Sequence, residues 1–357
     1  MAFITIPKIK IAGMAAAVPK KIVNNSDNTH KLSSEYDNQS FVEQTGVYER
    51  RIDETLTTSD LCYKGTEQLL KDLNWEKEDI EALIFVSQTF DFIAPATACV
   101  MQDKLGLSKE CLAFDIELGC SGWVYGMTSL ASLMVNGSVK KALLMVGDAR
   151  RNYEGSERHE GALFGYAGTI TALEYDENSP GFICHLGSDG SGYNSLYIKE
   201  GGSRYPLNKN SLIESNEDGK IGCGLSSKMN GMDVFSFGIS AAPKSIKALC
   251  NKYNLNLNNT DFLILHQANK QMNDIIVKKL KFEAAKVPES LSLFGNTSSA
   301  SIPLTIVTSL RDILSHGKHT LLCCGFGIGL SWGTIWLETD DIIISPLVEV
   351  ESNENML

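Results

Sequence analysis

Four short apolar runs, each bounded by polar residues or glycine, divide the chain into similar stretches. They are EALIFVSQ (81–88), KALLMVGD (141–148), DFLILHQA (261–268) and HTLLCCGFG (319–327). Runs that stay apolar over consecutive positions, without alternation, are typical of strands buried on both faces of a sheet. The first two runs begin 60 residues apart and the last two 58 residues apart, which predicts two pairs of strands in similar surroundings.

A helix-like pattern precedes the first member of each pair. TSDLCYKGTEQLLKDLNW (58–75) opens with a Ser/Asp capping signal, and SFGISAAPKSIKALCNKYN (236–254) has the same place before the second pair. Between the two runs of each pair lies a glycine-led turn, LGCSGW in the first and FGNTSS in the second. This order predicts an α/β chain made of two similar halves, although a chance likeness of short apolar runs remains an alternative at this point.

The two glycine-led turns place two polar residues at corresponding positions. When Gly119 is aligned with Gly295, Cys120 stands opposite Asn296, 176 residues further along the chain. The polar stretch 200–231, rich in Gly, Ser and Asn, predicts a long connection between the halves or over a cleft. We therefore expect an N-terminal half at 1–180, a C-terminal half at 181–340 and a tail at 341–357.

Composition and charge narrow the classes of function. The 357 residues are 43% hydrophobic and 21% charged, as in an ordinary globular protein with a substantial core. Asp and Glu number 43 against 32 Lys and Arg, and the formal net charge is -11. This balance argues against general binding to nucleic acid or to an anionic membrane, while a local basic patch remains compatible with it.

The cysteines and the N-terminus suggest a cytoplasmic protein. The nine cysteines contain no CxxC pair and no zinc-like spacing with the six histidines, so we expect a reducing compartment and no metal site. The N-terminal apolar segment reads as a strand and turn rather than a signal peptide, because its first charges follow the first apolar run. No window approaches ~18 uninterrupted apolar residues, so we expect no membrane insertion.

Cys120 is a candidate nucleophile. The sequence SGWVYGMTSLASLMVNGSV that follows it has apolar residues at helical spacing, which places the cysteine at the start of a helix. There, unpaired N–H groups and the helix dipole favour a thiolate, which is suited to attack a thioester. The flanking Gly119 and Gly122 permit a substrate to approach the backbone. A buried structural cysteine is the alternative.

Two further residues have positions suited to catalysis. His266 stands at the end of a predicted strand, where a side chain faces the crevice of an α/β protein, and a hydrogen-bonded core histidine is the alternative. Asn296 occupies the turn that corresponds to Cys120, and an Asx-turn or helix cap is the alternative there. The glycine-rich CCGFGIGLSWG (323–333) follows a strand and can direct backbone N–H groups at a ligand.

Four motifs in this order, LGCSGWVYG, HQAN, GNTSSASIP and FGIGLSWG, resemble the ketoacyl-acyl-carrier-protein synthase III branch of the thiolase-like condensing enzymes. The resemblance extends over nearly the whole chain and leaves out only the tail. It implies a five-layered αβαβα fold of two similar halves. It also implies a homodimer in which FDFIAPATACVMQ (90–102) lies near the partner's acyl pocket.

The resemblance also implies roles for individual residues. Cys120 would take an acyl group from a thioester, after which His266 and Asn296 would polarise the carbonyl of a malonyl thioester and stabilise the enolate left by loss of CO2. The backbone N–H groups of Cys120 and Ile328 would hold the oxyanion of the acylation step. No permanently bound cofactor is implied, and acyl-coenzyme A or acyl-carrier protein would be the substrate.

Several positions depart from the family pattern. Ile328 replaces a glycine of the usual FGGG, and Tyr166 stands where an aspartate is usual. Phe41 corresponds to a tryptophan that stacks on the adenine of coenzyme A, and Arg158 is the candidate for its partner arginine. Ala94 occupies the position of a bulky residue that closes the acyl pocket, so we expect a larger or differently shaped acyl group.

Basic residues suited to an acidic carrier protein are partly kept. Lys278 and Lys279 match a basic pair of the family, and Lys270 lies close to the position of a family arginine. Together with Lys281 they form a cluster on a protein of net charge -11, for which an ordinary solvated helix face is the alternative.

Three functions are compatible with these observations. The leading hypothesis is a condensing acyltransferase that joins the Cys120-bound acyl group to a malonyl-carrier thioester, in a specialised lipid, polysaccharide or secondary-metabolite pathway. The second is an acyltransferase in which His266 is the general base for a hydroxyl or amine acceptor. The third is a non-catalytic partner subunit of a condensing heterodimer, against which the intact Cys, His and Asn set argues.

Overall fold

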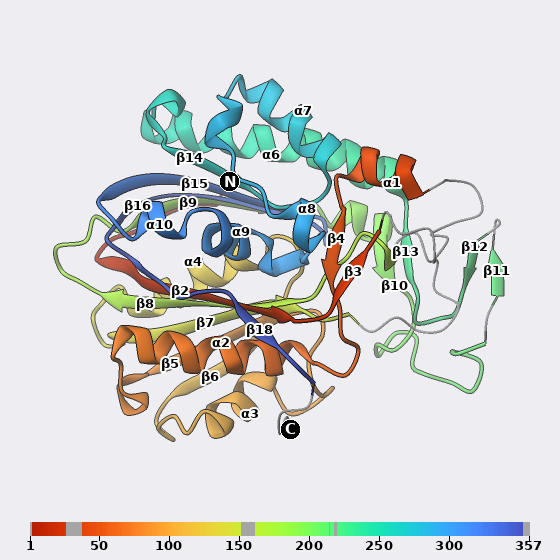
Figure 1. Ribbon diagram of the computed structural model, residues 1–357, viewed down its shortest axis with the longest axis horizontal. Helices are drawn as coiled ribbons and strands as arrows, with labels where there is room; N and C mark the ends of the chain where they lie inside the picture. Colours follow the sequence, from red (N-terminus) through yellow and green to blue (C-terminus); the bar gives the residue numbers. More distant parts are fainter. Residues whose placement is uncertain (1, 26–37, 151–160, 214, 218–219, 353–357) are drawn as a thin grey trace.

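Two stacked β-sheets form the centre of the computed structural model, which describes residues 2–25, 38–150, 161–213, 215–217 and 220–352 (Figure 1). The first sheet has the strand order β1-β9-β16-β15-β14, in which β14 and β15 are parallel and all other neighbours antiparallel. Its strands are β1 (Ala2–Ile6), β9 (Phe182–Ser188), β14 (Phe262–Leu265), β15 (Lys318–Gly327) and β16 (Ser331–Asp340).

The second sheet has the order β17-β2-β8-β7-β5-β6, and β18 also pairs with β2. β6, β5 and β7 are mutually parallel, whereas β8 is antiparallel to both β7 and β2. Its strands are β2 (Ile9–Pro19), β5 (Ala82–Ser87), β6 (Leu112–Glu117), β7 (Lys141–Asp148), β8 (Ala167–Tyr175), β17 (Ile343–Ile344) and β18 (Val348–Val350).

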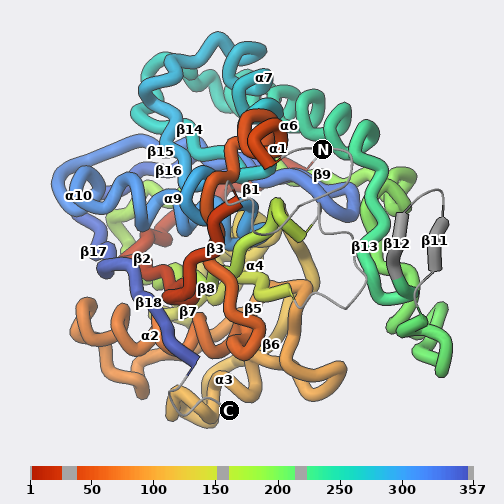
Figure 2. The backbone as a smooth tube through the Cα atoms, turned by 45° about the vertical axis from the view of Figure 1, so that its right-hand side comes forward, coloured from red at the N-terminus to blue at the C-terminus, as the bar shows by residue number. Residues whose placement is uncertain are grey.

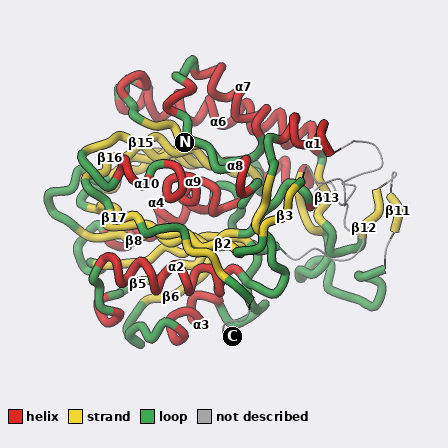
Figure 3. Tube along the Cα trace, viewed as in Figure 1, coloured by secondary structure: helices red, strands yellow, loops and turns green. Residues whose placement is uncertain are grey.

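Helices above, between and below the sheets complete five layers, as Figure 3 shows by secondary structure. The inner layer contains α4 (Gly122–Met134) and α9 (Ser301–Ser309), together with the short α10 (Arg311–Leu314). The outer layers are α2 (Thr58–Leu73) with α3 (Thr97–Lys104), and α6 (Gly231–Tyr253) with α7 (Lys270–Leu280). The αβαβα arrangement predicted from the sequence is confirmed.

The two halves repeat one topology. In the first half the sheet order is β2-β8-β7-β5, and in the second β9-β16-β15-β14, with the same parallel and antiparallel relations. All four apolar runs found in the sequence are strands of these sheets, namely β5, β7, β14 and β15. α2 matches the first predicted helix closely. α6 begins at Gly231, five residues before the predicted start, because Asn230 caps it by accepting from the N–H of Asp233.

Short elements surround this frame. They are β3 (Ile22–Asn24), β4 (Glu49–Arg51), β10 (Leu196–Ile198), β11 (Ser215–Glu217), β12 (Lys220–Gly222), β13 (Ser227–Met229), α1 (Asn38–Thr45) and α8 (Leu291–Phe294), with 3-10 turns at Lys77–Asp79, Gly190–Ser195, Leu257–Asn259, Ala284–Lys286 and Ser298–Ala300. The polar stretch predicted as a connection contributes β11, β12 and β13, which lie at one side of the molecule (Figures 1 and 2).

The core between the sheets explains why α4 is apolar around most of its circumference. Trp123 is 1% exposed and donates from its indole N–H to the hydroxyl of Thr171 at 3.0 Å. Met127 and Leu130 are fully buried in the same cluster. A helix enclosed on two sides by sheets needs apolar residues on both faces, and this fixes the position of its N-terminal end, where Cys120 lies.

The ends of the chain cross between the halves. β1, from the N-terminal half, pairs with β9 in the first sheet, whereas β17 and β18, from the C-terminal end, pair with β2 in the second. Arg51 on β4 forms an ion pair with Glu349 on β18 at 2.7 Å, which ties the tail to the body of the protein. Within the described part of the chain, no helix has the length and apolar character needed to cross a membrane.

Candidate active site

Cys120 lies in the turn between β6 and α4, directly before Ser121, the N-cap residue of the helix. The Ser121 hydroxyl is hydrogen-bonded to that of Ser331 at 2.7 Å, and the N–H of Gly122 donates to the carbonyl of Gly119 at 2.6 Å. These bonds hold the cysteine at the entrance of the buried helix and against the glycine-rich loop that follows β15.

Glycine at position 327 is required by the close approach of this loop to the cysteine. A Cβ at Gly327 would stand 2.8 Å from Sγ and 2.6 Å from Cβ of Cys120. Ile328, the next residue, does not adopt a positive φ, so its branched side chain is accommodated without strain where the family pattern has glycine. A backbone hydrogen bond from Ile328 reaches the cysteine sulfur.

Burial raises the pKa of the Cys120 thiol, and the carboxylate of Asp148 acts in the same direction. The Ile328 N–H and the Ser298 hydroxyl oppose this shift without reversing it. The expectation that the helix start favours a thiolate is therefore wrong for the resting site. The cost of desolvating a charged sulfur is larger than the stabilisation by nearby donors, so the resting group is a thiol.

His266 follows β14 directly and is 1% exposed. Its backbone N–H donates to the carbonyl of Cys324 at 2.9 Å, and its ring meets Phe326 edge to face at a centroid distance of 5.5 Å. Nδ1 is hydrogen-bonded to the hydroxyl of Ser301 at 2.7 Å. Burial lowers the pKa of His266 to about 3, and the Ser298 backbone carbonyl, which accepts from the ring, opposes this only in part. Because a carbonyl only accepts and Nδ1 is occupied by Ser301, the neutral imidazole carries its proton on Nε2.

This pKa has a consequence for acid stability. Between pH 6.5 and about 3 the unfolded chain binds a proton at His266 that the folded protein does not. The contribution of His266 to the free energy of unfolding is complete above pH 6.5. Below pH 6.5 this contribution falls by about 1.4 kcal/mol per pH unit. We expect the free energy of unfolding of His266→Gln, measured with urea from pH 7 to 4.5, to fall less steeply than that of the wild type. Equal slopes would contradict the buried neutral imidazole.

Asn296 is held so that its amide N–H2 faces the same space. Its Oδ1 accepts from the N–H of Ser298 at 2.8 Å, and its Nδ2 has a long contact of 3.4 Å to the carbonyl of Ala268. The backbone of Asn296 bonds to Leu163 and Gly165, which fixes it beside the first half of the chain. The Asx-turn considered from the sequence is present, and it turns the amide donors toward the cavity.

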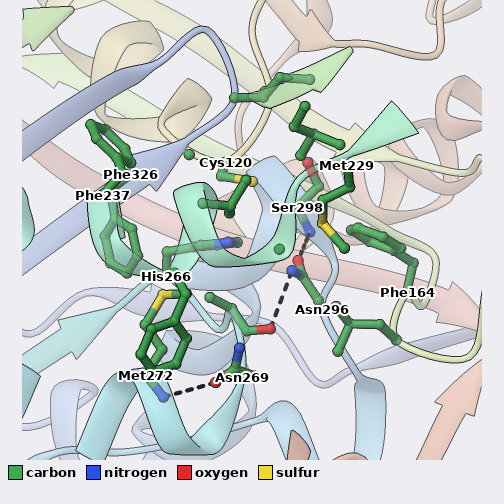
Figure 4. Close-up of a pocket in the computed structure, with 18 of the residues that line it drawn as sticks. Cys120, Phe164, Met229, Phe237, His266, Asn269, Met272, Asn296, Ser298 and Phe326 are labelled. Atoms are coloured by element: carbon green, nitrogen blue, oxygen red, sulfur yellow. Dashed lines mark hydrogen bonds between the residues drawn. The ribbon is translucent and has the colours of Figure 1, made fainter. Parts of the chain in front are cut away.

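One cavity of about 140 Å³, called here the Cys120 cavity, is lined by Cys120, His266, Asn296 and Ile328. Figure 4 shows the thiol, the imidazole and the carboxamide around this space. Its other walls come from the N-terminal ends of α6 and α7 and from an apolar set of side chains: Leu163, Phe164, Leu196, Met229, Val234, Phe235, Phe237, Met272 and Phe326.

Sequence reasoning missed two serines that shape the site. Ser298 lines the cavity with a positive φ of 51° and contacts the Cys120 sulfur through its hydroxyl, while Ser301 positions the ring of His266. The run of hydroxyl residues in GNTSSAS was the available signal, but nothing in the spacing indicates which of them point inward.

Other residues singled out from the sequence lie away from this cavity. Phe41 is 3% exposed and packs in a small cluster with Val42, Val47 and Leu291, and its place in coenzyme A binding stays a prediction. Ala94 is exposed and is absent from the described residues that line the Cys120 cavity. Arg158 lies outside the described residues.

Tyr166 has a structural role in place of the usual aspartate. It is 2% exposed, and its hydroxyl donates to the backbone carbonyl of Arg150. The buried guanidinium of Arg50 donates to Asn25 and to two backbone carbonyls rather than to a carboxylate, and burial lowers its pKa to about 10. The acceptors that Arg50 finds among the described residues are therefore neutral groups.

A thiol, a neutral imidazole and a carboxamide around one cavity, between two similar α/β halves, define an acyl-transferring enzyme with the thiolase-like fold. Two family models match the chain: 3-oxoacyl-[acyl-carrier-protein] synthase III over residues 114–190, and the C-terminal domain of the same enzyme over residues 250–339.

Whole-chain comparisons agree. Beta-ketoacyl-[acyl-carrier-protein] synthase III of Desulfitobacterium hafniense (strain Y51) is 32% identical over 330 residues, covering 91% of this chain and 96% of its own. The Streptococcus mutans enzyme of the same name is 31% identical over 329 residues, covering 91% and 98%. The crystal structure of 3-oxoacyl-(acyl-carrier protein) synthase from Burkholderia xenovorans LB400 superposes with a TM-score of 0.90 at 34% identity, covering 98% and 99%. The chain belongs to the beta-ketoacyl-[acyl-carrier-protein] synthase III family.

Proposed function

We propose that this chain is a condensing acyltransferase that loads an acyl group onto Cys120 and joins it to a malonyl-carrier thioester with loss of CO2. The observation that carries the proposal is the convergence of Cys120, His266 and Asn296 on one cavity, with two neutral N–H donors beside a thiol. The relatives are named beta-ketoacyl-[acyl-carrier-protein] synthase III, and this name supports the formation of a β-ketoacyl product on a carrier protein.

In the first step the Cys120 sulfur attacks the carbonyl carbon of an acyl thioester. The oxyanion is held by the backbone N–H groups of Cys120 and Ile328, the bond to the donor sulfur breaks, and the proton of Cys120 leaves on the departing thiol. Exchange of one thioester for another is nearly balanced in energy. A thiol with a raised pKa is also a good acceptor for the acyl group, because the acyl-enzyme bears no charge in the buried site.

In the second step a malonyl thioester loses its carboxylate as CO2. The electron pair of the broken carbon–carbon bond forms an enolate, whose oxygen accepts from Nε2–H of His266 and from Nδ2–H of Asn296. The enolate carbon then attacks the acyl carbon on Cys120, and the sulfur leaves as a thiolate that takes up a proton from solvent. Neutral donors in a buried cavity stabilise the charge that develops on the enolate oxygen. Charged donors would do the same only after losing their hydration on burial, a cost that neutral donors do not carry.

The low pKa of His266 favours this reaction over transfer to a hydroxyl or amine. A general base with a pKa of about 3 accepts a proton poorly at neutral pH, whereas a neutral N–H donor is what an enolate requires. The family departures at Phe41, Ala94, Tyr166 and Ile328 support a specialised lipid, polysaccharide or secondary-metabolite pathway.

Product analysis tests the proposal. The acyl-loaded protein, mixed with malonyl-carrier protein, is expected to release one CO2 per acyl group lost and to yield a β-ketoacyl-carrier product detected by mass. Acyl transfer to hydroxyl or amine acceptors without CO2 release would overturn it in favour of the alternative acyltransferase. Failure of every acyl donor to load the protein would point to a non-catalytic partner subunit.

The exposed face of α7 supports docking of a carrier protein near the cavity. Asn269 and Met272, at the start of α7, line the Cys120 cavity, and Lys278 and Lys279 lie exposed near its end. Lys270 is paired with Asp274 at 3.0 Å. A groove between α6 and α7 is lined by three lysines and no carboxylate: Ile239, Ser240, Pro243, Lys244, Lys247, Ala248, Asn251 and Lys279. This basic surface suits the acidic surface of a carrier protein.

Charge reversal on α7 is expected to weaken use of the carrier. The double variant Lys278→Glu, Lys279→Glu should raise KM for malonyl-carrier protein about tenfold. Each exposed ion pair between one of these lysines and a carboxylate of the carrier contributes a modest amount of binding energy. The kcat should be unchanged, and Lys109→Glu, which changes an exposed lysine after α3, should leave both constants unaltered. An unchanged KM in steady-state assays at low salt would contradict docking on α7.

We also propose that two copies associate through β6. Among the described strands β6 is the last of its sheet, so one row of its backbone groups faces no described strand. Leu112 on β6 is 46% exposed, and Phe92 and Ile93 in the loop between β5 and α3 are 52% and 98% exposed. We expect the wild type to sediment as a dimer and Ile93→Asp to shift toward the monomer, whereas Ile213→Asp should not. A monomeric wild type at micromolar concentration would contradict this assembly.

A further inference from the structure

A second, larger cavity of about 740 Å³ lies beside the Cys120 cavity and is called here the polar chamber. Its walls come from the start of α2, the loop between β5 and α3, and the segments at 193–198 and 225–227. Groups able to form hydrogen bonds line much of it: Thr57, Thr58, Gln88, Thr89, Asp91, Glu117, Arg150, Tyr193, Tyr197, Ser226 and Ser227.

The two spaces share a wall next to the nucleophile. Four residues line both of them: Gln88, Arg150, Leu196 and Ile328. A Cβ at Gly119, the residue before Cys120, would stand 2.4 Å from Oε1 of Gln88 and 2.7 Å from Cγ2 of Ile328. The side chains of Gln88 and Ile328 therefore lie against the turn that carries Cys120, between it and the polar chamber.

Gln88 is fixed by its backbone and has an unused side chain. Its N–H donates to Oδ1 of Asp148 at 2.8 Å, and this carboxylate is 4% exposed and also accepts from the hydroxyl of Ser299 at 2.8 Å. The amide of Gln88 has no hydrogen-bond partner among the described residues, although its side chain is half-buried. A half-buried amide beside the nucleophile is available to a group carried by the substrate.

The chamber is unsuited to a plain alkyl chain. The hydroxyls of Thr58 and Thr89 lie 2.7 Å apart, and Asp91 accepts from Ser59 at 2.8 Å. Burial of a methylene chain against such groups excludes water from them without replacing its hydrogen bonds. Among the described residues, the chamber is lined by two carboxylates, Asp91 and Glu117, and by one cation, Arg150, a balance that disfavours an acyl group ending in a carboxylate.

We propose that the acyl group carried by Cys120 bears one or more hydroxyl groups, which extend past Ile328 into the polar chamber and bond to the amide of Gln88. This inference rests on the proposed loading of Cys120 and adds the chemical class of the acyl donor. A hydroxyl both donates and accepts, and it matches the amide and the hydroxyl-rich walls at once.

Donor selectivity tests this assignment. Wild-type protein is mixed with equal amounts of butyryl-, 3-hydroxybutyryl- and 4-hydroxybutyryl-coenzyme A, and each acyl-enzyme is measured by intact mass in a single turnover without malonyl substrate. We expect at least one hydroxylated donor to load faster than butyryl by about tenfold or more, because the site's amide is left unpaired by the alkyl donor. Preference for butyryl would overturn the inference and leave the proposed function standing, whereas no loading from any donor would overturn both.

A variant isolates the role of Gln88. Gln88→Leu keeps the size of the side chain and removes its amide, so the ratio of the loading rates of the hydroxylated donor and butyryl is expected to fall to near unity. Gln68→Leu, the same exchange on the outer helix α2, should retain the wild-type preference. Unchanged selectivity in Gln88→Leu, with a melting temperature equal to that of the wild type, would also overturn the assignment.

Discussion

Replacement of Cys120 by alanine is expected to abolish the acyl-enzyme. The thiol is the atom that forms the new thioester, so its loss should lower the rate of acyl transfer by at least about a thousandfold, as removal of a covalent nucleophile does in other enzymes. Intact mass after incubation with a reactive acyl-coenzyme A measures the result directly, with one acyl group expected on the wild type and none on Cys120→Ala.

Other thiols provide the control for that experiment. Cys99 is exposed and is the described cysteine most open to non-specific acylation from solvent, whereas Cys62, Cys323 and Cys324 are fully buried. Cys99→Ala should therefore keep the adduct at wild-type rate. An adduct that persists in Cys120→Ala and disappears in Cys99→Ala would show that the reactive cysteine had been assigned wrongly.

Replacement of His266 by alanine is expected to separate the two half-reactions. Loss of one of two donors to the enolate should lower the rate of malonyl decarboxylation about 100- to 1,000-fold. Loading of Cys120 should change much less, because the thiol proton can leave with the departing sulfur. The measurement is CO2 release from malonyl-carrier protein by acyl-loaded enzyme, compared with single-turnover loading.

The histidine variant needs a test of folding as well. His316→Ala alters an exposed histidine after α10 and should leave both half-reactions intact. The Ser301→Ala variant removes the hydrogen bond to Nδ1 while keeping the ring, and it should lower decarboxylation less than His266→Ala does. If His266→Ala loses loading but keeps CO2 release, the histidine is a base for the thiol rather than a donor to the enolate.

The frame of the fold was accessible from the sequence because its central strands are buried on both faces. All six residues of β5 and seven of the eight in β7 are buried, which leaves a continuous apolar run as the signal. β6 carries no such signal, since it lies at a sheet edge with every residue at least partly exposed. Cys120, His266 and Asn296 were found because each directly follows a strand or a glycine-led turn, where side chains of α/β proteins face a crevice.

What the sequence did not indicate depends on packing between distant elements. The bond from Ser301 to His266 requires α9 to lie under the end of β14, and the contact of Gln88 with Gly119 requires β5 to end beside the nucleophile turn. The resting thiol was missed for a similar reason. Proximity to a helix start is visible in the sequence, but the loss of solvent around Cys120 is a property of the assembled halves.

The crossing of the chain ends has a consequence for synthesis of the protein. β1 is made well before β9 at residues 182–188, with which it pairs, and the edge of β2 that β17 and β18 cover stays open until those two strands have left the ribosome. Folding of the first half during translation is thus left unfinished until the last strands arrive. The nascent chain carries an unprotected strand edge for most of its synthesis, which is the kind of surface that chaperones cover.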